Sequence, residues 1–287
     1  LIYLLGERFF DRKTALLAAA GFIFYGPALI HEMLIIPATA AIFFSLTALL
    51  WWAGRDGDGS NLSLLAGGML LGIASLFSAA NLLFALTVIL FFGRGAGERT
   101  KRIGRGILIP TGGVCLILVP FILRNTLAAG GFIPLTVHSG VNFYIGNNPD
   151  AAGSFTPPDF LTPSATGIIR DSARRAAREE GKELSPALTA RFWFKKTLDF
   201  ITRRPGDWLK NTLRKISLLL GPRENYDILS AGGGGKRRSG YLLGFPLIGY
   251  GWIIPFALVG IFFSGRRKGL LLLYLFLAAH VCGVLIY

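Results

Sequence analysis

The amino-acid sequence predicts an α-helical polytopic membrane protein that carries a large, mainly helical segment outside the membrane. The chain of 287 residues is 52% hydrophobic, its mean hydropathy is +0.54, and only 16% of its residues are charged. A soluble domain of this size cannot hide so much apolar surface in one core. The apolar residues form long uncharged runs, and one polar segment, Arg124–Gly240, divides these runs into two groups. Helices, whose backbone groups are bonded internally, suit such runs in a bilayer.

Five of the apolar runs are close in length to the roughly 20 residues with which a helix crosses a bilayer. In chain order they are Thr14–Ile30, Met33–Ala53, Gly106–Leu123, Tyr241–Ser264 and Gly269–Tyr287. A sixth run, Leu62–Phe92, holds 31 uncharged residues, which is too long for one untilted crossing and short for two. Because Ser78–Asn81 offers a natural break, we expect two short or re-entrant helices that meet near the outer face.

The short basic loops set the predicted orientation. Gly6–Lys13, Gly93–Arg105 and Gly265–Lys268 are rich in Lys and Arg, and such loops belong on the cytoplasmic side. The spans between them then place the turn His31-Glu32 and the segment Arg124–Gly240 outside the cytoplasm. We therefore expect transmembrane helices in residues 1–123, an extracytoplasmic segment in residues 124–240, and C-terminal transmembrane helices in residues 241–287.

Both ends of the chain lie in apolar sequence. Leu1 is not a methionine, and Tyr287 lies within the last apolar run. We expect that a first span and a first outer loop precede Leu1, and that the last span continues beyond Tyr287. The abundance of Arg, Gly and Ala fits a multi-pass protein of a bacterial inner (plasma) membrane.

The formal net charge of +14 raises the question of nucleic-acid binding. The cations lie mostly beside the predicted spans, and no motif that reads RNA or DNA accompanies them, so we expect membrane lipids and no nucleic acid as partners. Cys115 and Cys282 fall in different apolar runs, which fits neither a disulfide framework nor a zinc site. No cofactor is identified, and the sequence leaves a requirement for a divalent metal open.

The polar segment contains three predicted helices. Gly167–Gly181 has a charged helical pattern, and Ser185-Pro186 has the cap and first-turn residues of a helix that ends near Arg203. Pro205 opens a third helix, in which one set of apolar residues recurs at helical spacing while Lys210, Arg214 and Lys215 lie around the other side. The apolar set is Trp208, Leu209, Thr212, Leu213, Ile216 and Leu220. This amphipathic helix suits either the membrane–water interface or packing against its own neighbours.

Two passages carry a family resemblance. The first reads LLGERFFDRKTALLAAAGFIFYGPALIHEMLIIPATAAIFF, and the second reads FILRNTLAAGGFIPLTVHSGVNFYIGNNPDAAG, followed later by RRPGDWLKNTLRKISLLLGPRENYD. With the helix order, these passages resemble the GT-C class of integral-membrane glycosyltransferases, and specifically the bacterial relatives of protein O-mannosyltransferases and of the aminoarabinose transferase. The chain departs from the Leu-x-Arg-Pro turn of that family, because the corresponding stretch reads LFSAANL.

The resemblance implies a GT-C-like bundle that transfers a sugar from a polyprenyl-phosphate donor to a lipid, glycan or protein acceptor on the extracytoplasmic face. Such a displacement needs a carboxylate to deprotonate the acceptor and cations to stabilise the phosphate leaving group. The principal catalytic Asp of the family lies on the first outer loop, which would precede Leu1. The resemblance therefore implies that these 287 residues alone are inactive.

Glu32 is the supporting catalytic candidate, because the predicted topology places it at the outer end of a helix pair, where a solvated turn residue is the alternative. The candidate substrate-binding residues are His31, Arg124, Asn125, Asn142, Tyr144, Asn147, Asn148, Lys215, Glu224 and Asn225. The alternatives remain open: Arg124 clamps a phosphate or anchors a helix boundary, and Lys215 binds phosphate or belongs to a solvated helix face. The asparagines contact sugar hydroxyls or shape turns, and Glu224 and Asn225 line the site or a surface loop.

Two other classes of function compete with the transferase. A carrier or flippase for lipid-linked glycans would use the polar segment as a gate, but transporters usually show paired inverted repeats, and the two halves of this chain are dissimilar. A non-catalytic membrane scaffold of an envelope-glycan complex would lack the acidic residue expected before Leu1. The sequence does not distinguish among possible sugars or acceptors.

Overall fold

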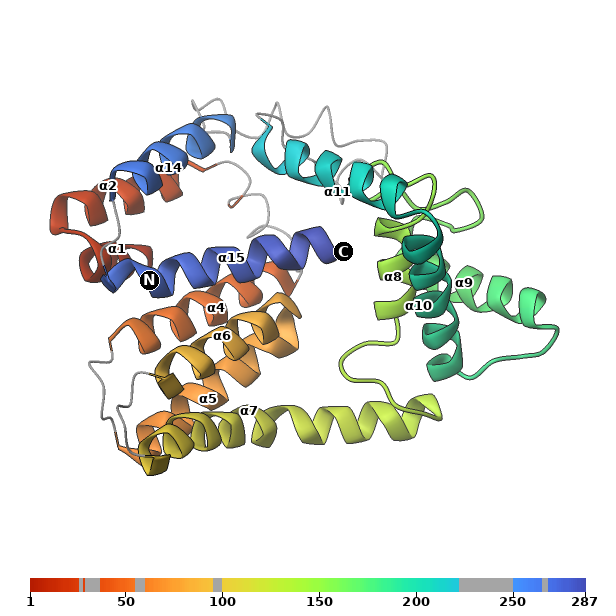
Figure 1. Cartoon of the computed structure of the whole chain (residues 1–287), viewed down its shortest axis with the longest axis horizontal. Helices are drawn as coiled ribbons and strands as arrows, with labels where there is room; N and C mark the ends of the chain where they lie inside the picture. The colour runs from red at the N-terminus through yellow and green to blue at the C-terminus, as the bar shows by residue number, and fades with distance from the viewer. Residues whose placement is uncertain (26–27, 29–36, 55–59, 95–99, 222–249, 265–267) are drawn as a thin grey trace. The chain divides into compact units, whose positions relative to one another are not determined.

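A computed structural model covers the chain, and it describes all residues except 26–27, 29–36, 55–59, 95–99, 222–249 and 265–267 (Figure 1). In the described residues every regular element is helical. The chain divides into two compact units. Unit 1 comprises Leu1–Pro120 and Phe245–Gly283, and unit 2 comprises Phe121–Gly244 and Val284–Tyr287. The predicted division at residues 123/124 and 240/241 concerns a membrane boundary, so it stays a prediction.

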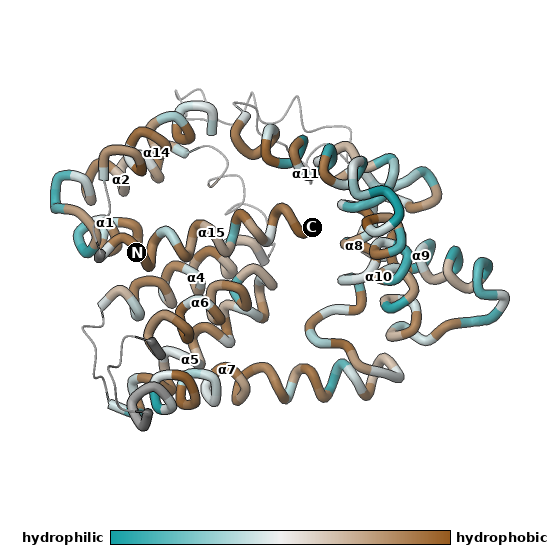
Figure 2. The backbone as a smooth tube through the Cα atoms, viewed as in Figure 1, coloured by the Kyte–Doolittle hydropathy of each residue, from teal (hydrophilic) through white to brown (hydrophobic). Residues whose placement is uncertain are grey.

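Unit 1 is built from apolar helices, which Figure 2 shows largely in the colours of hydrophobic residues. They are α1 (Ile2–Phe9), α2 (Arg12–Ile23), α4 (Pro37–Ala53), α5 (Asn61–Phe77), α6 (Ala80–Arg94), most of α7 (Thr100–Ala129), α14 (Tyr250–Ser264), the short 3-10 helix η1 (Lys268–Leu270), and most of α15 (Leu271–Ile286). The N-terminal caps of α2 and α5 are side chains, because Asp11 accepts a hydrogen bond from the backbone N–H of Thr14 and Ser60 accepts one from that of Ser63.

The core of unit 1 joins α4, α5, α6 and α15. Trp52, Leu71 and Phe84 are fully buried in one cluster, and the Phe84 ring meets the Phe276 ring edge to face at 5.0 Å. Glycines bring α5 and α7 into close contact: a Cβ atom on Gly68 would lie 2.1 Å from the carbonyl oxygen of Pro110, which no side chain tolerates. Small residues are common where apolar helices cross, because they let the two backbones approach closely and gain van der Waals contact.

The predicted break in the run Leu62–Phe92 is confirmed. Helix α5 ends at Phe77, Ser78 has an extended backbone, and α6 begins at Ala80. The buried amide of Asn81 donates from Nδ2 to the carbonyl oxygen of Ala74 at 3.0 Å, which ties the start of α6 to the end of α5. The same carbonyl oxygen also accepts the backbone N–H of Ser78 at 3.1 Å, so the Asn81 side chain adds a second hydrogen bond at the end of α5.

Two predicted boundaries were wrong. The run Thr14–Ile30 is not one helix, because α2 ends at Ile23 and its 12 residues are too few for a straight crossing. Helix α7 continues past Leu123 to Ala129, since residues 124–129 contain no proline or glycine, and it ends before Gly130, where the backbone turns left-handed at φ 66°. Met33–Ile36, the predicted start of the span before Ala53, lies outside the described residues.

One helix in the described residues is long and apolar enough to cross a membrane by length and composition, the stretch Gly104–Ala129 of α7. Five further apolar helices in the described residues of unit 1, α4, α5, α6, α14 and α15, have between 10 and 17 residues. The helical class of the fold is therefore shown, while the number of membrane crossings stays part of the proposal below.

In its described residues, unit 2 contains the whole of α8 (Ser139–Gly146), α9 (Ala165–Glu180), α10 (Pro186–Arg203) and α11 (Pro205–Leu220), together with the last residues of α7 and α15. The three predicted helices are confirmed. Ser164 caps α9 and Gly181 ends it in the left-handed region, at φ 69°. Ser185 caps α10 by accepting a hydrogen bond from the backbone N–H of Leu188, with Pro186 in the first helical position.

Helix α8 was not predicted, and it lies within the string that the sequence offered as a loop or sugar site. Val141 and Ile145 are buried on it, and they pack with Leu161 around the fully buried Trp193 of α10. The Trp193 indole donates from Nε1 to the carbonyl oxygen of Ser172 at 3.3 Å, which joins α10 to α9. Burial of this apolar face outweighs the turn preference of the glycines and asparagines around it.

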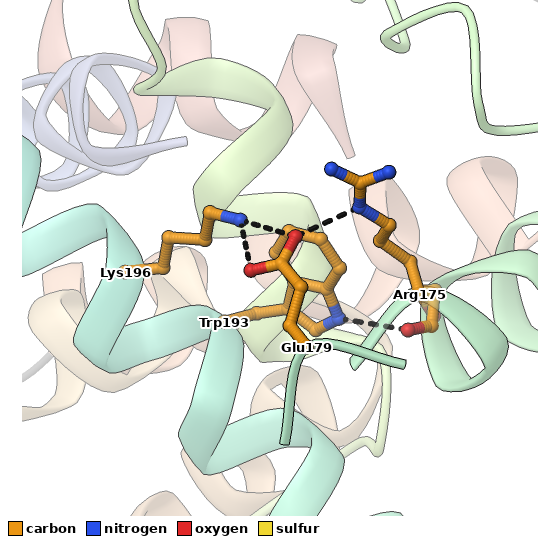
Figure 3. A network of polar contacts seen from close by, with 5 residues as sticks. Arg175, Glu179, Trp193 and Lys196 are labelled. Atoms are coloured by element: carbon orange, nitrogen blue, oxygen red, sulfur yellow. Dashed lines mark hydrogen bonds and ion pairs between the residues drawn. The ribbon is translucent and has the colours of Figure 1, made fainter. Parts of the chain in front are cut away.

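An exposed ion-pair network reinforces the joint between α9 and α10 (Figure 3). Glu179 of α9 accepts hydrogen bonds from Arg175 Nε at 2.7 Å and from Lys196 Nζ of α10 at 2.6 Å. The Lys196 ammonium also lies 5.3 Å from the ring centroid of Trp193, at the distance of a cation–π contact. Unit 2 therefore has a fixed helical framework on which α8 and α11 meet.

Candidate anion-binding site

Helix α11 buries two polar residues and exposes part of its apolar face. Asn211 and Lys215 are its only buried residues, and they are four positions apart, which places them on one face. Lys215 is 4% exposed, whereas Leu209 and Leu213 are 53% and 57% exposed. The interpretation of Lys215 as part of a solvated face was therefore wrong. The sequence shows which residues of α11 are apolar, but it does not show which face of the helix packs against the rest of the protein.

The buried face of α11 packs against the C-terminal end of α8. Asn211 donates from Nδ2 to the carbonyl oxygen of Gly146 at 2.9 Å, and Trp208 donates from Nε1 to Oδ1 of Asn147 at 3.1 Å. Lys215 Nζ lies 3.4 Å from the same Oδ1 atom. The last carbonyl groups of a helix lack helical partners and carry partial negative charge, so amide donors and a cation are favourable there.

Lys215 carries its charge among neutral acceptors. Besides Asn147, its Nζ atom donates to the carbonyl oxygen of Leu285 at 3.1 Å, which belongs to the same unit. In the part of the chain that the structure describes, no carboxylate forms an ion pair with it. Burial of the ammonium group lowers the pKa of Lys215 to about 8. An ammonium group that is removed from water without an opposite charge is costly, and such groups gather at functional sites.

A polar atom beside Lys215 lacks a hydrogen-bond partner among the described residues. Asn211 Oδ1 is buried and accepts no hydrogen bond from them, although the Nδ2 atom of the same side chain donates to the carbonyl oxygen of Gly146. Both side chains converge on Gly146, where a Cβ atom would lie 3.4 Å from Lys215 Nζ. The pair therefore offers one cationic donor for an anion and one acceptor for a hydroxyl group.

The asparagines that follow α8 are occupied with the chain itself. Asn147 is 1% exposed and donates from Nδ2 to the carbonyl oxygens of Phe143 and Ile286, at 3.1 and 2.8 Å. Asn148 is also buried, donates to the carbonyl oxygens of Tyr144 and Ile145, and accepts from the backbone N–H of Asp150. Their amides close the end of α8, which is the turn role that the sequence offered beside sugar contact.

Asn142 and Tyr144 occupy different environments on α8. Asn142 is exposed on the helix surface. Tyr144 is half-buried against Trp193, with ring centroids 4.7 Å apart, and burial followed by the nearby charge of Glu179 raises its pKa. The structure therefore does not bring Asn142 and Tyr144 into hydrogen-bond contact with Lys215.

Arg124 and Asn125 lie inside α7 and not at its end. Arg124 is exposed, and its Nη1 atom donates to Oδ1 of Asn125 at 3.1 Å. Asn125 donates from Nδ2 to the carbonyl oxygen of Leu135 at 2.8 Å, which holds the chain that follows α7. The arginine keeps further donors for a phosphate group, since a guanidinium has five N–H bonds.

The remaining predicted site residues, His31, Glu32, Glu224 and Asn225, lie outside the described residues. No three His, Cys, Asp or Glu side chains gather as metal ligands in the described part of the chain. The sequence interpretation missed two members of the Lys215 cluster, Trp208 and Asn211. A signal for them existed in the sequence. Trp208, Asn211 and Lys215 are separated by three and four residues, so their three polar side-chain groups lie on one face of a helix.

Comparison of the chain with protein-family models, with curated proteins and with solved structures found no match.

Proposed function

We propose that this chain belongs to a multi-pass membrane glycosyltransferase, which transfers a sugar from a polyprenyl-phosphate donor to a lipid, glycan or protein acceptor on the extracytoplasmic face of the plasma membrane. The sequence resemblance to GT-C enzymes supports this function. The observation that carries it in the structure is the burial of Lys215 in unit 2 among neutral acceptors, which is suited to the phosphate group of such a donor.

The apolar surface of unit 1 supports the membrane location. In the most apolar 18-residue stretch of α7, 17% of the residues are buried, so most of its apolar side chains lie at the surface of unit 1. On α14, Trp252, Phe256 and Phe262 are between 69% and 81% exposed. Monomeric soluble proteins rarely expose contiguous apolar patches of such extent, whereas lipid tails cover them without loss.

The reaction needs charge compensation at the phosphate. The bond between the anomeric carbon and the phosphate oxygen breaks while the acceptor oxygen bonds to that carbon, and the phosphate leaves with an additional negative charge. The ammonium group of Lys215 would stabilise this charge, and Asn211 Oδ1 would accept a hydrogen bond from a donor hydroxyl. Because Lys215 is buried, the surrounding side chains must move before a ligand reaches it. Glu32 remains the proposed supporting carboxylate that receives the acceptor proton.

The test is a transfer assay with the full-length protein in membranes, a radiolabelled polyprenyl-phosphate sugar and envelope acceptors. We expect transfer by the wild type, a large loss in Lys215→Met, and near-normal transfer in Lys195→Met, a matched change at an exposed position of α10. If the folded wild type transfers no sugar from any polyprenyl carrier, the transferase proposal fails and the carrier and scaffold alternatives replace it.

A further inference from the structure

The exposed apolar stripe on α11 lies opposite the buried Asn211 and Lys215. Leu209, Leu213 and Leu220 are 53%, 57% and 49% exposed, and Ile216, which is half-buried, falls between them on the same stripe. Positions separated by four, three and four residues align along one side of a helix. The helix therefore satisfies its polar face inside unit 2 and leaves a continuous apolar stripe outside it.

Cations border this stripe. Lys210 and Arg214 are exposed on the same flank of α11, and Arg203 and Arg204 are exposed just before the helix begins. A leucine stripe with a basic flank is complementary to a bilayer surface with anionic headgroups, since the leucines enter the acyl boundary and the cations meet lipid phosphates.

A second copy of the chain is a poorer fit to the stripe. Stable protein interfaces involve about 20–30 residues on each side, and the stripe offers four. Cations are also depleted from the centre of such interfaces but favoured beside anionic lipid. The charge pattern thus favours a lipid surface as the occupant.

We propose that α11 lies on an anionic membrane surface, with Leu209, Leu213, Ile216 and Leu220 in the lipid and with Lys210 and Arg214 against the headgroups. A helix with its side chains is about 10–12 Å across, so this orientation holds the Lys215 cluster within one helix diameter of the headgroups. The inference rests on the membrane location in the proposed function, and it does not depend on sugar transfer.

The experiment uses the full chain, with Cys115 and Cys282 replaced by alanine, in nanodiscs that contain anionic phosphatidylglycerol. Single cysteines carry an environment-sensitive fluorophore at Leu213, at Leu116 of α7, and at Arg178 of α9, which are all exposed positions. Lipid-borne nitroxide and aqueous iodide serve as quenchers. We expect nitroxide to quench the label at positions 116 and 213, and iodide to quench it at position 178.

Charge is tested by neutralising the flank. Lys210→Gln and Arg214→Gln should each lower the equilibrium constant for docking at position 213 by about fivefold, and zwitterionic nanodiscs, which remove both contributions, should lower it by about 25-fold. The matched change Arg178→Gln on α9 should have no effect on the label at position 213.

The outcomes separate the two proposals. If iodide quenches positions 213 and 178 equally while nitroxide quenches position 116, the docking inference fails and the membrane location stands. If nitroxide fails to quench position 116, the membrane location fails as well. If neither quencher reaches position 213, and this shielding increases as more copies of the protein are placed in each nanodisc, a second copy covers the stripe and the lipid inference is overturned.

Discussion

The Nζ atom of Lys215 lies 3.4 Å from the Oδ1 atom of Asn147, although 68 residues separate them in the chain. This contact joins the middle of α11 to the end of α8, and it keeps a cation in a place where the described residues provide only neutral acceptors. The proposed role of Lys215 in phosphate recognition follows from this relationship.

The first prediction concerns pH. Burial lowers the pKa of Lys215 to about 8, and only the protonated ammonium attracts a phosphate. Affinity for polyprenyl phosphate should therefore be full below pH 8 and fall as pH rises above it, by about tenfold for each unit. A titration of affinity from about pH 6.5 to about pH 9.5, which extends about 1.5 units on either side of the lowered pKa, measures this. An equally steep decline in Lys215→Met would assign the pH dependence to another group.

The same pKa shift predicts how stability changes with pH. In the unfolded chain the lysine keeps its ordinary, higher pKa, so between about pH 8 and that value the unfolded state binds more protons than the folded state. The free energy of unfolding should therefore rise with pH across this window, through the contribution of Lys215. In Lys215→Met this contribution should be absent. Chemical denaturation of both proteins at about pH 7.5 and about pH 9.5, on either side of the lowered pKa, would show whether the free energy of unfolding rises only in the wild type.

The second prediction places a negative charge beside the ammonium. Asn211 is four residues before Lys215 on the same face, so Asn211→Asp should supply the opposite charge that the site lacks. The aspartate would compete with a phosphate, and affinity for polyprenyl phosphate should fall further than in Asn211→Leu. Both variants lose the hydrogen bond to Gly146, and Asp keeps an acceptor oxygen that Leu lacks, so a lower affinity in Asn211→Asp can only come from its charge. Equal affinities in the two variants would mean that the ligand does not bind beside Lys215.

The third prediction concerns the crossing of α5 and α7. A Cβ atom on Gly113 would lie 2.4 Å from the carbonyl oxygen of Leu65, whereas one on Gly112 would meet nothing within 4 Å. Gly113→Ala should therefore lower the free energy of unfolding by about 1–3 kcal/mol through overpacking. Gly112→Ala should be neutral or slightly stabilising, because alanine is the better helix former by about 1 kcal/mol. Thermal unfolding in detergent compares the two variants.

The fourth prediction concerns the ion pairs of Glu179. Burial alone would raise its pKa, but hydrogen bonds from Lys196 and Arg175 outweigh burial and lower it. A carboxyl group with a lowered pKa stabilises the fold above its unfolded pKa, and this contribution is lost as pH falls through the folded pKa. Glu179→Gln should cost about 1 kcal/mol at pH 7 and less at pH 3.

Glu180 provides the matched control for that change, because it is the exposed neighbour of Glu179 at the end of α9. Glu180→Gln should leave the denaturation midpoint unchanged at both pH values. A loss in Glu179→Gln that persists in full at pH 3 would show that the side chain acts by packing and not by its charge.

Local signals predicted much of the helical framework. Ser185 and Pro186 define the start of α10, and Ser78 separates α5 from α6, because caps and breaks act through neighbouring backbone groups. The same local chemistry misled at α8. Its glycines and asparagines favour turns, but contact of Val141 and Ile145 with Trp193 stabilises a helix there.

The candidate site was harder to predict because it depends on which face of α11 meets the protein. The periodicity of α11 shows which of its residues are apolar, and only the contacts with Gly146 and Asn147 show that the face with Asn211 and Lys215 packs against the protein. The burial of Lys215 therefore arises from tertiary structure. A lysine in an amphipathic helix is normally placed in water, since transfer of its charge from water is unfavourable.

The most direct test of the central claim is the affinity of the purified full-length protein for polyprenyl phosphate in nanodiscs. Wild type, Lys215→Met and Lys195→Met are compared at pH 7, with circular dichroism to confirm that each is folded. Loss of one charge-assisted contact corresponds to about 1.5–3 kcal/mol, so Lys215→Met should bind at least about tenfold more weakly while Lys195→Met binds nearly as the wild type does. Equal affinity in wild type and folded Lys215→Met would contradict the assignment of Lys215 as the phosphate-binding residue.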